Sequence, residues 1–277
     1  MLTHTFCHMP GIGLKTEKRF WESGLGTWDD IGSGERPALL TPARNRMLQE
    51  YVPLSRQRFE SGDIEFFGAR LPASEGWRVF KEFRDGLVYL DIETTGLSKS
   101  YHEVTTIALY DGAKIRYYIN GQNLDEFVRD IQNYSLIVTY NGKSFDVPFL
   151  ETWFDFRLGH YHIDLRHVLK SLGYSGGLKG CEKQLGLDRG DLDGVSGYFA
   201  VVLWKEYQKS HRQEALETLL AYNIEDVINL EKLMVIAYNQ KLRGTPFLEH
   251  NRIEEPGEPA RPFDPSPRLI DELQSFL

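Results

Sequence analysis

Only two cysteines, Cys7 and Cys181, occur in the 277 residues, and they lie far apart along the chain. This number and spacing exclude a disulfide framework, and we expect both residues to be reduced and buried. The sequence also has no run of roughly 18 or more apolar residues, so it offers no membrane-spanning helix. Its first residues lack the basic and apolar pattern of a secretory signal, and we therefore expect a cytoplasmic protein without membrane association.

An excess of positive charge is also missing. The chain has 32 Lys and Arg residues against 40 Asp and Glu residues, for a formal net charge of −8. Because phosphate contacts dominate nucleic-acid affinity, a protein that coats nucleic acid would carry a strong positive excess. The charge therefore argues against a passive coating protein. It says little against a nuclease, since an enzyme that gathers carboxylates around divalent metal ions can be acidic overall.

The hydrophobic pattern from about residue 86 predicts an α/β fold. Short runs of β-branched and aromatic residues indicate strands, and Asp111-Gly112 between two of them is a hairpin signal. We expect strands at 87–92, 104–110, 113–119, 135–140 and 161–163, and helices at 123–133, 145–156 and in several stretches up to about 240. A three-stranded meander followed by alternating strands and helices predicts a mixed sheet flanked by helices.

Three regions are expected along the chain. Residues 1–60 are predicted to form a helical N-terminal region, with one helix at about 43–51. Residues 61–244 are predicted to form the α/β domain. Residues 245–277 are rich in proline and read as a tail or surface strap with a short amphipathic end.

Two carboxylates mark the end of the first expected strand. Residues 87–90 are apolar enough for a buried central strand, and Asp91 and Glu93 follow at alternate positions. Alternate residues point to the same face of a strand, roughly 6–7 Å apart. Like charges that lose water there repel each other, and a hard divalent cation would relieve the repulsion, although simple salt bridges at an exposed strand end would also explain the pair. The polar turn Thr94-Thr95-Gly96 favours a ligand site, because glycine lets a ligand approach the backbone closely.

A second acidic residue lies at the start of the helix that follows strand 135–140. Asn141-Gly142 forms a turn there, and Asp146 falls in the first helical turn, next to Phe145. A carboxylate at this position interacts favourably with the helix dipole, so Asp146 could serve the helix alone. It could also serve a metal site, with Asn141 either in the turn or on a substrate.

The third candidate lies in a long amphipathic helix that is predicted to start near Gln213. Asp226 falls at the margin of the apolar stripe of this helix, about 20° from Leu219. Tyr222 lies one turn earlier on the same side, whereas Glu225 is predicted to project to solvent. A charged residue at a buried edge needs a partner, which here is either a Lys or Arg side chain or a metal ion.

Taken in order, Asp-x-Glu, Asn-x(4)-Asp and Tyr-x(3)-Asp resemble the three exonuclease motifs of the DEDD superfamily, in its tyrosine branch (DEDDy). The segments LDIETTGL, NGKSFDVPFL and LLAYNIEDV are most similar to those of a bacterial group of RNase H-like predicted exonucleases. Ile163-Asp164-Leu165 and Gly177-Leu178-Lys179 are also typical of that group. The resemblance covers about residues 64–240 and implies an RNase H-like fold.

The resemblance implies a 3′–5′ exonuclease that hydrolyses phosphodiester bonds by a two-metal mechanism and releases 5′-mononucleotides. Two divalent ions, Mg²⁺ or Mn²⁺, would be held by Asp91, Glu93, Asp146 and Asp226, with Tyr222 orienting the attacking water. The implied partner is the 3′ end of single-stranded DNA or RNA. The residues implied to contact it are Thr94, Thr95, Gly96, Leu97, Asn141 and Phe145.

The N-terminal segment CHMPGIGLKTEKRFWESGLGTWDDI resembles a helix-hairpin-helix. Gly11 and Gly13 would expose backbone amides at a helix N-terminus, which is a favourable place for a phosphate. Lys15 and Lys18 would add positive charge to this loop. Too few residues precede the loop for a full first helix, so a purely structural cap is the other interpretation.

Two other functions fit parts of the pattern. A catalytically silent nucleic-acid-binding module on a nuclease fold would be expected to lose a carboxylate, and all four are present. An RNase H-like endonuclease would cut internally, and the Tyr-x(3)-Asp helix disfavours it. The sequence does not decide between DNA and RNA, and it indicates neither a protein partner nor an oligomeric state.

Overall fold

In a computed structural model, which describes residues 1–31 and 40–275, the chain divides into two units. The first comprises Met1–Asp85 with Tyr238–Ile253, and the second comprises Gly86–Ala237 with Glu254–Leu277. Both cysteines are free and buried, as predicted. Among the described residues, no helix is both long enough and apolar enough to cross a membrane.

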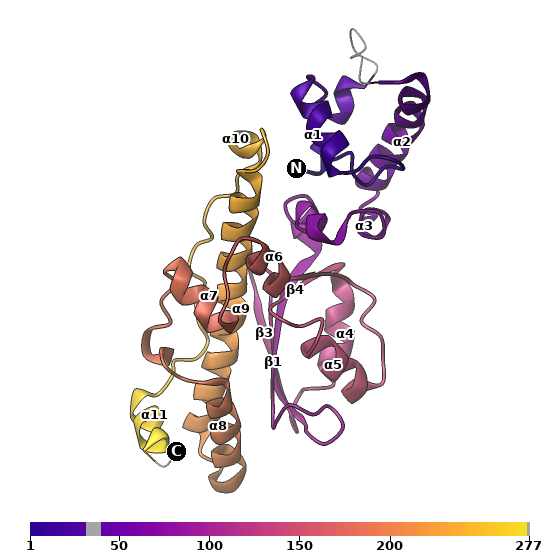
Figure 1. Cartoon of the computed structure of the whole chain (residues 1–277). Coiled ribbons are helices and arrows are strands. Elements are labelled where there is room, and N and C mark those ends of the chain that lie inside the picture. Colours follow the sequence, from indigo (N-terminus) through magenta and orange to yellow (C-terminus); the bar gives the residue numbers. More distant parts are fainter. Residues whose placement is uncertain (32–39, 276–277) are drawn as a thin grey trace. The chain divides into compact units, whose positions relative to one another are not determined.

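The second unit is built on a five-stranded mixed sheet in the order β3-β2-β1-β4-β5 (Figure 1). Its strands are β1 (Leu87–Thr94), β2 (Val104–Tyr110), β3 (Ile115–Ile119), β4 (Leu136–Thr139) and β5 (Tyr161–Asp164). β1 pairs antiparallel with β2 and parallel with β4. The predicted hairpin joins β2 to β3, with Gly112 in the left-handed region at φ 88°. The predicted α/β fold with a mixed sheet is confirmed.

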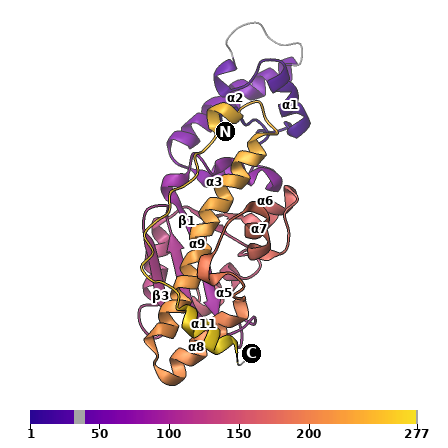
Figure 2. The same ribbon diagram turned by 90° about the vertical axis from the view of Figure 1, so that its left-hand side faces the viewer.

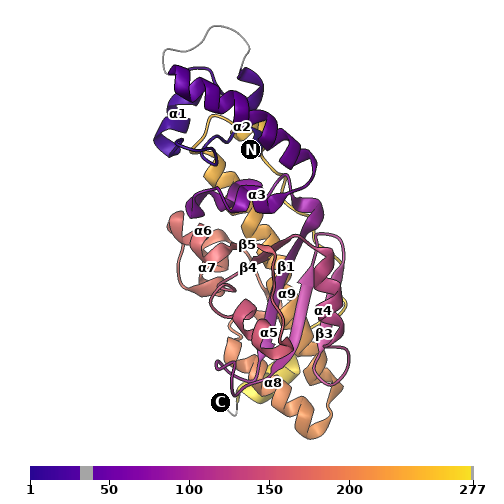
Figure 3. The same ribbon diagram turned by 90° about the vertical axis from the view of Figure 1, so that its right-hand side faces the viewer.

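Helices cover both faces of this sheet. α4 (Glu126–Asp130) and α5 (Asp146–Phe154) lie on one face, and α9 (Gln213–Leu242) lies on the other with α8 (Gly197–Ser210) (Figures 2 and 3). The unit also contains α6 (Leu165–Ser171), α7 (Gly177–Leu185), α11 (Pro267–Gln274), and the 3-10 turns η5 (Ile131–Asn133) and η6 (Gly190–Leu192). Coverage on both faces explains why β2 is buried along its whole length and β1 along most of it.

The first unit is helical in its described part. It contains η1 (Leu2–His4), α1 (Leu14–Glu22), η2 (Trp28–Asp30), α2 (Pro42–Glu60), α3 (Ile64–Gly68), η3 (Ala73–Val79) and α10 (Leu248–Asn251), and η4 (Arg84–Gly86) spans the division between the units. The helix expected at 43–51 is longer than predicted. It begins where the Thr41 hydroxyl accepts a hydrogen bond from the Arg44 amide.

The aromatic core of the first unit explains why residues 61–85 belong to it. The rings of Trp28 and Phe67 are stacked, with centroids 6.2 Å apart, and Phe83 packs on Phe67 at 6.2 Å. The predicted boundary at residue 60 therefore differs from the observed division. Periodicity along the chain reveals an apolar face but not the element that this face packs against.

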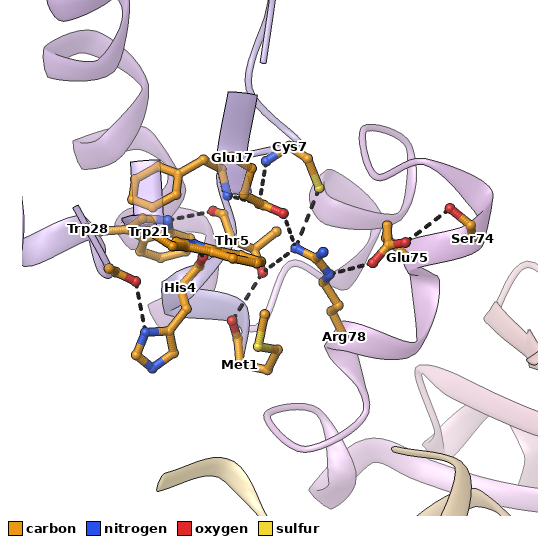
Figure 4. A network of polar contacts seen from close by, with 12 residues as sticks. Met1, His4, Thr5, Cys7, Glu17, Trp21, Trp28, Ser74, Glu75 and Arg78 are labelled. Atoms are coloured by element: carbon orange, nitrogen blue, oxygen red, sulfur yellow. Dashed lines mark hydrogen bonds and ion pairs between the residues drawn. The ribbon is translucent and has the colours of Figure 1, made fainter. Parts of the chain in front are cut away.

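A buried polar network ties the N-terminal segment of this unit to α1 and η3 (Figure 4). The Glu17 side chain is 1% exposed, and its Oε2 accepts hydrogen bonds from the amides of Phe6 at 2.6 Å and Cys7 at 2.9 Å. Its Oε1 accepts a hydrogen bond from Arg78 Nη1 at 2.7 Å, and Arg78 Nε donates to Glu75 Oε2 at 2.7 Å. Such a network satisfies charges that would otherwise be costly to bury.

The Pro-rich C-terminal segment includes two helices, α10 and α11, and it corrects one prediction. Glu225 of α9 is 5% exposed rather than exposed to solvent. Its carboxylate accepts hydrogen bonds from Arg261 Nε at 2.8 Å and Nη2 at 3.2 Å. The prediction was wrong because this partner lies on a segment without helical or strand periodicity.

Candidate active site

The end of β1 carries the first two candidate ligands. β1 pairs with β4 up to Tyr89, which lies opposite Val138, and pairing with β2 continues beyond that point. Asp91 and Glu93 therefore extend past the end of β4 on one face of β1. One carboxylate oxygen from each of Asp91, Glu93 and Asp226 lies within 4.8 Å of the other two. These distances allow the three carboxylates to share one cation.

The turn between β4 and α5 brings Asp146 to the same place. Asp146 is 4% exposed, and its carboxylate accepts a hydrogen bond from the amide of Ile92 in β1. The turn begins with Asn141 in the left-handed region at φ 66°. Asp164, which caps α6, accepts hydrogen bonds from the amides of Asn141 at 2.8 Å and Lys143 at 3.1 Å. Asp164 thus fixes the turn that positions Asp146.

α9 contributes the remaining motif residues from the opposite face of the sheet. Asp226 is 5% exposed and Tyr222, one turn earlier, is 2% exposed. Asn223, between them, donates a hydrogen bond from Nδ2 to Asp91 Oδ2 at 2.7 Å. This bond joins α9 directly to β1. All four carboxylates that the sequence motifs predict are therefore gathered between β1, α5 and α9.

Two positively charged side chains, which the sequence motifs did not place at the site, lie over the Tyr222 ring. Lys179 Nζ is 4.5 Å from the ring centroid, and the guanidinium carbon of Arg189 is 5.3 Å from it. Lys179 Nζ also donates a hydrogen bond to the carbonyl of Val195. Cation–π contacts of this kind favour one orientation of the aromatic ring. The contacts with Lys179 and Arg189 therefore hold the Tyr222 ring in one orientation.

Arg189 is also part of a buried network that sequence reasoning missed. Its Nη1 donates hydrogen bonds to both carboxylate oxygens of Glu182, and Asn229 Nδ2 donates to Glu182 Oε1 at 2.9 Å. Its Nη2 lies 2.5 Å from Asp226 Oδ1. One signal was available: Asn223, Asp226 and Asn229 recur every three residues, which places polar groups along one side of α9.

Burial makes the carboxyl cluster electrostatically unfavourable without a cation. Loss of water raises the pKa of Asp91 and Glu93 well above the ordinary range, and repulsion from Asp226 raises both further. Burial also raises the pKa of Asp226, although Arg189 opposes this shift. Burial raises the pKa of Asp146 to about 7. Closely spaced carboxylate oxygens in this state are suitable ligands for Mg²⁺ or Mn²⁺, which would neutralise the repulsion.

The raised pKa of Asp146 predicts a pH-dependent stability of the metal-free protein. A carboxyl with a folded pKa of about 7 and an ordinary value of 3.8 stabilises the fold at low pH, and the contribution is lost as the pH rises through 7. In EDTA, the free energy of unfolding of the wild type should therefore fall by about 2–3 kcal/mol between pH 5 and pH 8, relative to Asp146→Asn. Urea unfolding at both pH values measures this difference. Parallel pH profiles for the two proteins would contradict the prediction.

Four of the predicted substrate-contacting residues follow Asp91 and Glu93 at the end of β1. Leu97 is 87% exposed. Thr94 Oγ1 donates a hydrogen bond to the Gly96 carbonyl at 2.7 Å, and a Cβ at Gly96 would lie 2.5 Å from the His102 ring, so a larger residue there would displace that ring. The Thr95 amide donates to the Glu103 carbonyl at 2.9 Å, which closes the loop. These hydrogen bonds hold the ends of the loop in place, while the side chain of Leu97 projects into solvent.

The two predicted contacts in the second motif are partly engaged within the protein. Phe145 packs against the core beneath the sheet, with its ring 5.6 Å from that of Phe149. The Asn141 side chain accepts a hydrogen bond from Arg166 Nη1. Their roles in substrate binding stay predictions.

The predicted phosphate loop lies in the first unit. Gly13 caps α1 without a side-chain hydrogen bond, and Gly11 adopts φ 73°. Lys15 and Lys18 of α1 are exposed. A helix-hairpin-helix has a helix on each side of its loop, and here the three-residue turn η1 precedes it. The contact of this loop with nucleic acid stays a prediction.

The mixed sheet with carboxylates at the end of its central strand defines an RNase H-like nuclease fold. Comparison with known families agrees, because residues 88–238 match the family model of the RNase H superfamily. This match covers more than half of the chain, and the chain belongs to the RNase H superfamily. No curated protein matches the chain.

A solved structure that resembles part of this chain is that of the family B DNA polymerase from the hyperthermophilic archaeon Pyrobaculum calidifontis. The sequence identity is 14% and the TM-score is 0.44. The similarity covers 61% of this chain and 27% of the polymerase chain, so it spans about a quarter of the polymerase.

Proposed function

We propose that this protein is a metal-dependent 3′–5′ exonuclease that hydrolyses single-stranded DNA or RNA and releases 5′-mononucleotides. The observation that carries the proposal is the group of carboxylate oxygens from Asp91, Glu93 and Asp226 within 4.8 Å of one another. Asp146 lies close enough to raise the pKa of Asp91 by electrostatic repulsion. Four desolvated carboxylates in one place repel one another, and they suit a pair of divalent ions.

The four carboxylates would hold the ions, and the other residues would orient the reactants. Bound divalent ions would supply an activated water and charge stabilisation at the phosphate. Burial raises the pKa of Tyr222 further above its ordinary value of 10, so its hydroxyl keeps its proton at neutral pH. Tyr222 therefore acts as a hydrogen-bond donor that orients the water, and not as a base. Asn223 fixes the orientation of the Asp91 carboxylate through Oδ2.

Substrate binding would use the loop after β1. Leu97 would contact the terminal base from this loop, since its apolar side chain is exposed next to the acidic end of β1. Thr94, Thr95 and Gly96 would line the terminal nucleotide, with Asn141 at the backbone and Phe145 at the base. Gly11 and Gly13, together with the exposed Lys15 and Lys18, would add a phosphate contact in the first unit.

Hydrolysis of 5′-labelled single-stranded DNA and RNA oligonucleotides tests this function. With Mg²⁺ or Mn²⁺, we expect a descending ladder of products that EDTA abolishes, and a circular strand should stay intact. The ladder would also show which sugar is preferred. Cutting of the circle would indicate an RNase H-like endonuclease instead. Retained binding with no hydrolysis under any metal would indicate a catalytically silent binding module.

A further inference from the structure

Arg189 is anchored on one side and contacts the candidate metal site on the other. Its side chain is 4% exposed, and the Glu182 side chain that accepts both of its Nη1 hydrogen bonds, at 2.9 Å and 3.0 Å, is 1% exposed. Asn229 holds Glu182 from α9 at 2.9 Å. On its other side, Arg189 Nη2 lies 2.5 Å from Asp226 Oδ1, which makes a close ion pair, although the geometry of these two atoms is not that of a hydrogen bond. A buried guanidinium with two carboxylate partners cannot leave without exposing unpaired charges.

Asp226 therefore has two roles that conflict electrostatically. It belongs to the three-carboxylate group that could hold a cation, and it already contacts a fixed cation. Burial raises the pKa of Glu93, and the charges of Lys179 and Arg189 oppose that shift. Asp226 is the carboxylate of the cluster with which Arg189 forms a close ion pair. A metal ion at this group and the guanidinium would repel each other through a short, poorly solvated path.

We propose that Arg189 is a resident counter-ion that stabilises the metal-free site and weakens metal binding at Asp226. The inference rests on the proposed function in one respect, since it takes Asp226 to be a metal ligand. Removal of the positive charge should leave the cluster more negative, so that a divalent ion binds more tightly. The metal-free protein should then be less stable, because Glu182 and Asp226 both lose their partner.

Titration of the full chain with Mn²⁺, followed by calorimetry or by the electron paramagnetic resonance of free Mn²⁺, tests this role without reference to activity. Arg189→Met should bind Mn²⁺ about tenfold more tightly than the wild type, whereas Arg189→Lys should remain close to it. In EDTA, Arg189→Met should melt at a lower temperature, and Mn²⁺ should reduce that difference. If Arg189→Met folds poorly, Arg189→Gln removes the charge and keeps a hydrogen-bond donor, with the same expected direction.

Arg261→Met is the matched control, because Arg261 pairs with Glu225, the neighbour of Asp226 on α9. It should leave Mn²⁺ affinity unchanged. Equal or weaker binding by both neutral variants of Arg189 would overturn the inference. Mn²⁺ binding by Asp226→Asn distinguishes a failure of this inference from a failure of the proposed function. If Asp226→Asn binds Mn²⁺ as tightly as the wild type does, Asp226 is not a metal ligand and the proposed metal site is wrong. If Asp226→Asn loses Mn²⁺ binding, the metal site stands and only the role of Arg189 is overturned.

Discussion

Asp91→Asn and Asp226→Asn should each reduce the hydrolysis of single-stranded oligonucleotides by at least about a thousandfold. Each change removes a charged ligand from the group whose oxygens lie within 4.8 Å of one another. A loss of about 4 kcal/mol of transition-state stabilisation corresponds to roughly that factor. Single-turnover cleavage of a 5′-labelled strand at saturating Mg²⁺ or Mn²⁺ measures the effect.

The control for this prediction is Glu225→Gln, which alters the carboxylate next to Asp226 on the same helix. Glu225 pairs with Arg261 and not with the cluster, so hydrolysis should stay within about threefold of the wild type. The Asn variants should also stay folded, since burial already favours the uncharged form of Asp91, and Asp226→Asn leaves Arg189 paired with Glu182. Wild-type activity in either Asn variant would exclude the proposed ligand set.

Arg78→Met should lower the free energy of unfolding of the first unit by about 3–5 kcal/mol, because it leaves the buried Glu17 carboxylate without its charged partner. Glu17 is 1% exposed and would keep only the hydrogen bonds from the amides of Phe6 and Cys7. The change also removes the contact with Glu75. Urea unfolding followed by tryptophan fluorescence reports this loss, since Trp28 and Trp77 are buried in the same unit.

Two variants give this measurement its controls. Arg58→Met removes an exposed ion pair with Asp63 in the same unit, at 3.1 Å, and should cost less than about 1 kcal/mol. The double variant Arg78→Met with Glu17→Gln should recover part of the lost stability, because no isolated charge remains. Equal losses for Arg58→Met and Arg78→Met would show that burial does not set the strength of the Glu17–Arg78 pair.

Local regularities explain how much of the candidate site could be predicted. The two-residue period of a strand places Asp91 and Glu93 on one face, and the sequence shows both features directly. The turn of a helix places Tyr222 beside Asp226 in the same way. The hairpin at Asp111-Gly112 was equally predictable, because few residues adopt the conformation that its turn needs. Each of these features depends on neighbours within a few positions.

The partners of buried charges could not be predicted in this way. Arg189 contacts Asp226, Arg261 contacts Glu225, and Asn223 contacts Asp91 from another element. The spacing places Asn223 and Asn229 beside Asp226 on one side of α9, but it does not show which distant group each side chain contacts. A buried charge takes whichever complementary group the packing brings within hydrogen-bond reach.

The sequence by itself thus determined the strands, the order of the acidic motifs and the faces on which their side chains lie, because local periodicity and turn chemistry encode them. Only the tertiary structure decided that residues 61–85 pack with the N-terminal unit, and that Glu225 is buried under Arg261. It also decided that a fixed guanidinium accompanies the carboxylate cluster. These features arise from contacts between segments far apart in sequence, and such contacts depend on how whole elements pack.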